Sequence, residues 1–249
     1  VRNVKAFAVH FPRKGRYPRN VDTLLNEWAG TATLCSLDLS NLSYKESSSI
    51  FVVGGIVQTF PKHRMRALRR IVLNEVLRAE LQGLFDLAPM LQSISVLNGE
   101  RLSGTLKLNA GVSSATSRRS ANLTSLSITN LAKARMSTVL PMVTYIGQHL
   151  KVLRFNGGPF IDSKVLSVLS TMDTPPKLKE LSLAQCQGMQ SFHVYNFLLR
   201  CASELEWLDL SFCSGMSGLP SPRMSLKDAN GGLLPVPVLP RLQTLLLDH

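Results

Sequence analysis

Apolar residues recur along the chain with the spacing L-x-x-L-x-L. Two segments carry the pattern in full, with a cysteine in the ninth position: Leu178, Leu181, Leu183, Cys186 and Leu205, Leu208, Leu210, Cys213. Every member of the second segment lies 27 residues after its counterpart in the first. A fixed period of about 20–30 residues indicates a chain built from stacked copies of one supersecondary unit.

Weaker copies of the pattern precede and follow these two segments. They begin at Val4, Leu34, Leu68, Leu91, Leu123, Leu150 and Leu242. The alternation of positions 4 and 6 predicts a short strand with one buried face. Between the strands, apolar residues at helical spacing predict helices within 21–28, 136–143, 165–169 and 192–201. Returning to a parallel strand requires such a crossover.

The sequence therefore predicts a single α/β solenoid over residues 1–249, with about eight or nine irregular repeats. Parallel strands would line a concave face and helices a convex face. Three stretches interrupt the period and are predicted to be insertions, at about 43–63, 97–121 and 218–240. The last of these is rich in proline and glycine, which oppose a regular repeat.

Composition and charge narrow the compartment and the class of partner. The chain is 45% hydrophobic and 18% charged, which is typical of a folded protein. A net charge of +12 favours polyanionic partners. Four cysteines without a C-x-x-C pair indicate a reducing compartment. No apolar run reaches the roughly 18–20 residues of a membrane helix. We therefore expect an intracellular protein, cytoplasmic or mitochondrial.

Sequence patterns of catalytic chemistry are lacking. The chain has no glycine-rich phosphate-binding motif and no G-x-S-x-G motif, and its five histidines show no metal-ligand spacing. We therefore expect no enzyme, no bound metal or cofactor, and no small-molecule substrate.

Template positions 3, 5 and 7 should point to the concave face and form a protein-binding surface. The candidate residues there are Arg154, Glu180, Trp207, Asp209 and Ser211. Tryptophan and arginine dominate the energetics of many interfaces, which makes Trp207 the candidate anchor. The alternative is that Trp207 packs beneath the following loop, for example against Leu219 or Leu233.

Basic clusters form a second candidate surface. Their members are Arg13, Lys14, Arg16, Tyr17, Arg19, Lys62, Arg64, Arg66, Arg69, Arg70, Arg118 and Arg119. Cations interleaved with an aromatic ring can follow a phosphate backbone while the ring stacks on a base, which predicts RNA binding. The alternative is an ordinary solvated charge run or an acidic protein partner.

The segments LKELSLAQC and LEWLDLSFC resemble the cysteine-containing subfamily of leucine-rich repeats, best known from the substrate-binding halves of F-box ubiquitin-ligase subunits. The resemblance implies a right-handed α/β solenoid with a protein-binding role. It also implies that Cys186 and Cys213 are buried at the turn that leaves each strand. A metal site or a disulfide between these two cysteines is the alternative.

Three functions follow as hypotheses. The first is a scaffold or adaptor that binds other proteins within a larger assembly. The second is an RNA-contacting component of a ribonucleoprotein such as a mitochondrial ribosome. The third is the substrate-recognition part of a ubiquitin-ligase adaptor, which requires an F-box outside these residues.

Overall fold

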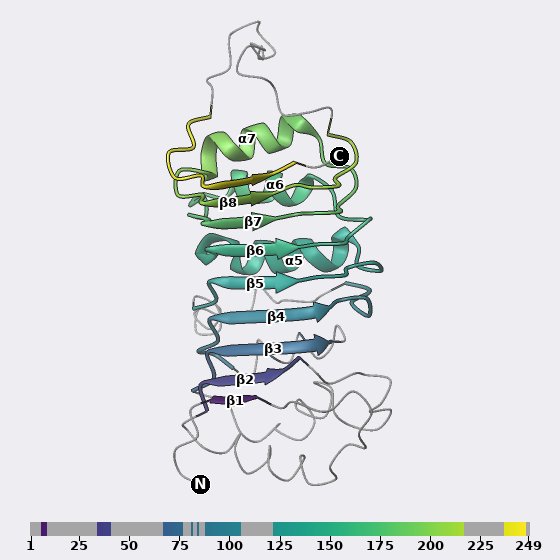
Figure 1. Cartoon of the computed structure of the whole chain (residues 1–249), viewed down its shortest axis with the longest axis vertical. Coiled ribbons are helices and arrows are strands. Elements are labelled where there is room, and N and C mark those ends of the chain that lie inside the picture. Colours follow the sequence, from purple (N-terminus) through teal and green to yellow (C-terminus); the bar gives the residue numbers. More distant parts are fainter. Residues whose placement is uncertain are drawn as a thin grey trace, which may run out of the picture.

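A single open sheet of parallel strands runs the length of the protein (Figure 1). The computed structural model describes residues 6–8, 34–40, 67–76, 81, 84, 88–105, 122–216 and 237–247. Within them the strands are β1 (Ala6–Ala8), β2 (Ser36–Leu39), β3 (Arg70–Glu75), β4 (Ser93–Asn98), β5 (Ser125–Ile128), β6 (Val152–Phe155), β7 (Glu180–Ser182), β8 (Trp207–Asp209) and β9 (Thr244–Leu246). Their spatial order is their order in the sequence.

The register of the sheet follows the leucine pattern. Leu126 lies opposite Leu153, and Leu181 lies opposite Leu208, so that equivalent template positions are aligned across neighbouring strands. Each of the nine copies of the pattern contains one strand, which confirms the predicted strand positions. The chain advances by one strand per unit, as expected for a solenoid-like α/β arrangement.

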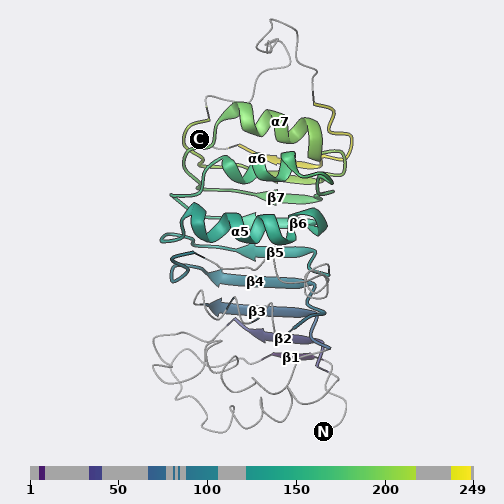
Figure 2. The ribbon, with the colours of Figure 1, turned by 180° about the vertical axis from the view of Figure 1, so that it is seen from behind.

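In the range 122–216, helices lie on one face of the sheet, as Figure 2 shows from behind. They are α5 (Met136–Ile146), α6 (Lys164–Thr171) and α7 (Ser191–Cys201), and a 3-10 turn, η1 (Gly147–His149), follows α5. All three confirm helices predicted from apolar spacing. The helix predicted within 21–28 lies outside the described residues.

Side chains of the strands and helices meet in one apolar core. On β5, Leu126 and Ile128 are fully buried, and they belong to the same cluster as Val139 and Val143 of α5. The intervening residues Ser125 and Ser127 are partly exposed. This alternation places positions 4 and 6 of the template against the helices and positions 3 and 5 on the opposite face of the sheet.

Local hydrogen bonds fix the start of α6. The carboxylate of Asp162 accepts a hydrogen bond from the backbone N–H of Lys164 at 2.8 Å. The side chain of Ser163 makes no capping hydrogen bond, although it precedes the first helical residue. Asp162 therefore satisfies one of the free N–H groups at this helix end.

The predicted insertions fall mostly outside the described residues. Residues 43–63, 106–121 and 218–236 are not described, so the insertion predicted at 43–63 stays a prediction. Strand β4 continues through Leu97 and Asn98, so the first two residues of the predicted insertion at 97–121 belong to the sheet. Residues 237–240 form no helix or strand.

The turn that leaves the strand is left-handed in four successive repeats. The eighth template position has positive φ at Asn130 (54°), Gly157 (69°), Gln185 (59°) and Phe212 (55°). Glycine and asparagine adopt this conformation readily, whereas a bulky aromatic residue pays a steric cost. The geometry of the repeat therefore outweighs the preference of Phe212.

Candidate protein-binding surface on the open face of the sheet

The open face is the side of the sheet that the described helices leave uncovered, formed by template positions 3, 5 and 7. Its centre is lined by small hydroxyl side chains, and these are Ser93, Ser95, Ser125 and Ser127 of β4 and β5. All four are partly exposed. Because serine side chains are short, the backbone of a partner can approach these two strands closely.

Arg154, Glu180 and Trp207 form a cluster beside the serines. The guanidinium of Arg154 on β6 makes an ion pair with the carboxylate of Glu180 on β7. Its central carbon also lies 5.2 Å from the centre of the Trp207 ring on β8, in cation–π geometry. One arginine thus orders side chains from three strands. The structure brings these three predicted residues together, and Trp207 is half-buried.

A buried polar network lies below this cluster. Ser182 Oγ is 3.0 Å from Oδ2 of Asp209 and 2.6 Å from Oδ1 of Asn156. The hydroxyl carries a single proton, and the carboxylate is the stronger acceptor, so we assign that proton to Asp209. Oδ1 of Asp209 accepts from both the backbone N–H and the hydroxyl of Ser211.

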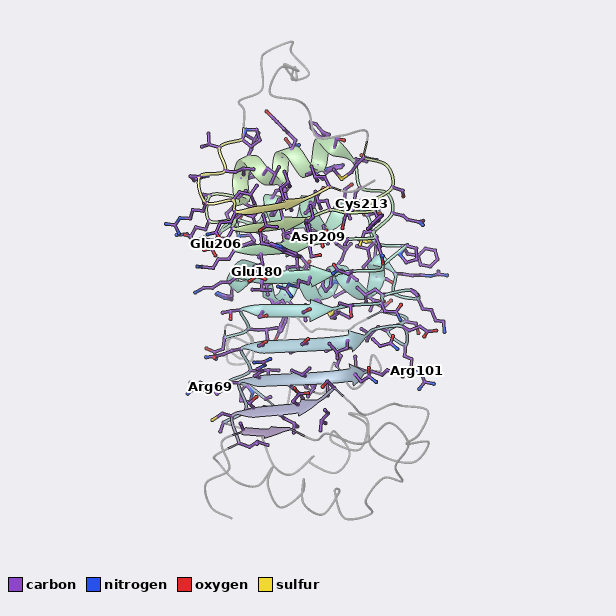
Figure 3. The ribbon with its side chains drawn as sticks, viewed as in Figure 1. Arg69, Arg101, Glu180, Glu206, Asp209 and Cys213 are labelled. Carbon is purple, nitrogen blue, oxygen red and sulfur yellow. The ribbon has the colours of Figure 1, made fainter. Side chains whose placement is uncertain are left out.

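The prediction that Asp209 and Ser211 face a partner is corrected by their burial. Asp209 is only 7% exposed and Ser211 only 9%, while Ser182 is fully buried. Asp209 turns into the sheet because three donors satisfy its oxygens there. Its carboxylate positions the strand end instead of standing free for a partner. Asp209 is the last residue of β8 and Glu180 is the first residue of β7, and Figure 3 accordingly shows Glu180 nearer the N-terminal ends of the strands.

The two template cysteines are buried thiols that bond to neighbouring repeats. Cys186 Sγ donates to the carbonyl oxygen of Phe155 at 3.1 Å, and Cys213 Sγ donates to that of Leu183 at 3.0 Å. Both thiols are free, and each bonds to a different carbonyl. Burial raises the pKa of Cys186 to about 12, and it also raises the pKa of Cys213. These cysteines therefore stay protonated near neutral pH and are poor nucleophiles or metal ligands.

The second candidate surface lies mostly outside the described residues. Only Arg69 and Arg70 are described, and both are exposed where β3 begins. The other members lie outside the described residues, and they are Arg13, Lys14, Arg16, Tyr17, Arg19, Lys62, Arg64, Arg66, Arg118 and Arg119. RNA binding by this cluster stays a prediction. Leu219 and Leu233, the alternative neighbours of Trp207, lie outside the described residues too.

Two residues near the end of the open face, Asn156 and Phe212, were not predicted from the sequence, and Ser182, expected on the open face at template position 5, is fully buried. Asn156 and Ser182 belong to the buried network, and Phe212 is 59% exposed in its left-handed turn. The signal for the turn was present, because Asn130 and Gly157 occupy the same template position as Phe212. Pairing within the network depends on contacts between repeats, which the template does not specify.

Among the described residues, His, Cys, Asp and Glu form no group of three or more that could hold a metal ion. None of the helices in the described ranges has the length and apolar composition needed to cross a lipid bilayer. A scan against models of known protein families gives no match for this chain, and a search of curated proteins finds no significant relative.

Proposed function

We propose that this chain is a non-enzymatic protein-interaction module of the leucine-rich repeat class, acting as a scaffold or adaptor within a larger assembly. The open face would hold the partner protein, with Arg154, Glu180 and Trp207 as its central contacts. The observation that carries the proposal is the fixed cluster of these three side chains on a parallel sheet.

The recurring local structure supports the repeat class. Cys186 and Cys213 make equivalent hydrogen bonds one repeat apart, and the eighth position is left-handed in four repeats. In proteins of the leucine-rich repeat class the strand side is concave, so the open face would be the inner surface of a curved solenoid. A concave surface is suited to enclosing a partner.

The arrangement of the cluster supports a binding role. Arg154 holds Trp207 in place, which lowers the entropy that the ring loses when a partner covers it. The small serines on β4 and β5 lie next to this cluster of larger side chains. A partner would therefore approach the sheet backbone closely at the serines and contact the aromatic ring beside them. Aromatic and arginine side chains are enriched among residues that contribute most to binding.

A comparison of two aromatic variants tests the proposal. Trp207→Ala removes the ring from the open face, and Phe192→Ala removes a ring that is 56% exposed on α7, on the helix side. Proteins captured by the wild-type chain should be retained by Phe192→Ala and lost by Trp207→Ala, with circular dichroism showing that both variants remain folded at the temperature of the assay. A captured set that is the same for all three chains would refute the role of the open face.

The ubiquitin-ligase hypothesis is a narrower form of this proposal. It adds the requirement that the captured proteins include the other subunits of a ligase. Under this hypothesis the open face would bind the substrate and a separate F-box would bind the ligase. Trp207→Ala should therefore still capture the other ligase subunits.

A further inference from the structure

Exposed cations stand at the N-terminal ends of β3 and β6, with polar neutral residues at the starts of β4 and β5 between them. We call this edge the N-terminal rim and define it by Arg69, Arg70, Gln92, Thr124, His149 and Lys151. Arg69, Gln92 and Lys151 each immediately precede the first residue of a strand, and all three are exposed. The rim thus joins residues from four repeats that are far apart in the sequence.

The rim carries positive charge that the described residues do not neutralise. Residues 67–70, 88–93, 122–125 and 147–152 contain no Asp or Glu. Arg69, Arg70 and Lys151 make no ion pair within the described part of the chain. Gln92 and Thr124, which lie between these cations along the edge, contribute neutral hydrogen-bonding groups.

The opposite edge of the same strands is different. There the cations are matched by carboxylates, because Arg101 pairs with Glu75 and Lys133 pairs with Glu100. Figure 3 shows Arg69 and Arg101 at the two opposite edges of the sheet. At the starts of β7 and β8 the cations are also paired, as in Lys179 with Glu206 at 2.9 Å. Among the described residues, the unpaired cations of this edge thus stand at the starts of β3 and β6.

The rim has the dimensions of a linear polyanion site. Strands are spaced by about 4.8 Å, so the starts of β3 and β6 lie roughly 14 Å apart. That distance exceeds the Debye length of about 8 Å at physiological ionic strength, so Arg69 and Lys151 repel each other little in the free protein. A phosphate chain laid along the edge would contact both cations and release its condensed counterions.

We propose that the N-terminal rim binds the phosphate backbone of a single-stranded nucleic acid. Arg69, Arg70 and Lys151 would contact phosphates, and the side-chain amide of Gln92 would donate hydrogen bonds between them, whereas the Thr124 hydroxyl already donates to the carbonyl oxygen of Gln92 at 3.3 Å. This site adjoins the open face, because Arg70 occupies template position 3 beside Ser93, but it lies on β3 to β6 and does not include Trp207 of β8. A phosphate chain fits better than a folded acidic protein because the cations are arranged along a line with the neutral donor Gln92 between them.

Fluorescence anisotropy with a labelled oligouridine tests the proposal on the full chain. The rim variant carries Arg69→Gln, Arg70→Gln and Lys151→Gln. The matched control carries Lys133→Gln, Arg135→Gln and Lys164→Gln, which remove equal charge from exposed positions at the opposite strand ends. Circular dichroism and melting temperature verify that both variants are folded.

We expect the rim variant to lose at least tenfold in affinity, while the control loses less than threefold. The slope of log affinity against log salt should fall by about two in the rim variant, at roughly 0.7 per lost phosphate contact. Arg69→Lys with Arg70→Lys should keep both affinity and slope. Equal losses in the rim variant and the control would overturn the proposal, as would tighter binding to vesicles containing phosphatidylserine or to polyglutamate than to oligouridine.

Discussion

The guanidinium carbon of Arg154 lies 5.2 Å from the centre of the Trp207 ring, although the two residues belong to strands separated by β7. The same guanidinium pairs with Glu180 on the intervening strand. Side chains of three repeats are therefore coupled on the open face. Arg154 therefore contacts the ring of Trp207 in the absence of any partner.

This coupling should be measurable as non-additivity. In a double-mutant cycle of Arg154→Ala and Trp207→Ala, we expect a coupling energy of about 0.5–1 kcal/mol in urea unfolding. Arg135 and Phe160 form the control pair, at 6.0 Å and with both residues exposed, and their coupling should be smaller. Strict additivity for Arg154 and Trp207 would mean that their contact contributes no stability.

Asp209 should be more important for stability than an equivalent aspartate on β2. Asp209→Asn replaces an acceptor of three donors by an amide, and we expect a loss of about 1–3 kcal/mol. Asp38 occupies the same template position, is half-buried, and accepts from the N–H of Ser40 at 2.9 Å. Asp38→Asn should therefore cost less. Equal losses in urea unfolding would argue against the buried network.

Substitutions at the left-handed eighth position should have opposite signs. Phe212→Gly and Gln185→Gly remove the steric strain of a side chain in the left-handed conformation. Glycine also makes the unfolded chain more flexible, which opposes this gain, so we expect the free energy of unfolding to rise by about 0.5 kcal/mol for each variant. Gly157→Ala should lose about 1–2 kcal/mol, because its new methyl group would enter the same strained conformation. That methyl group would also lie 3.3 Å from Cα of Asn130. A destabilised Phe212→Gly would show that the ring packs against the protein.

The buried thiols predict a loss of stability in alkaline solution. Burial raises the pKa of Cys186 from 9.0 to about 12 and that of Cys201 to about 11. The folded protein therefore retains protons that the unfolded chain releases, and stability falls as the pH rises from 9 toward 11 or 12. Over this pH range, each such thiol lowers the free energy of unfolding by up to about 1.4 kcal/mol per pH unit.

Cys186→Ala isolates this contribution. The variant should be less stable at pH 8, because it lacks the hydrogen bond to Phe155 and leaves a small cavity. Between pH 8 and pH 10.5 it should lose less free energy of unfolding than the wild type. The same pH dependence in both proteins would mean that Cys186 titrates normally.

The strands could be predicted from the sequence because their signal is local. Leu126 and Ile128 alternate with Ser125 and Ser127, and this alternation alone assigns the buried and open faces of β5. Helix α7 was predicted from the helical spacing of Phe192, Tyr195, Leu198 and Leu199; of these, Tyr195 and Leu198 are buried, whereas Phe192 is exposed. Each element is encoded within a few residues, so one repeat is sufficient to identify it.

The site was predicted less completely because its contacts join separate repeats. Within its own repeat, the template position of Asp209 predicts an open-face residue. Its burial depends on a hydrogen bond from Ser182, 27 residues earlier. The orientation of Arg154 toward Trp207 likewise depends on two further strands. The template predicts which face a residue lies on, but the pairing of side chains across strands is decided by their packing.

Site-specific photo-crosslinking tests the central claim most directly. A benzophenone amino acid would replace Ser125 on the open face in one chain and Ser137, exposed on α5, in a second chain. After irradiation in lysate, we predict a discrete crosslinked partner from position 125 that is missing from position 137 and disappears when Trp207→Ala is added. Crosslinks that are absent at position 125, identical at both positions, or indifferent to Trp207 would contradict the assignment of the open face as a protein-binding surface.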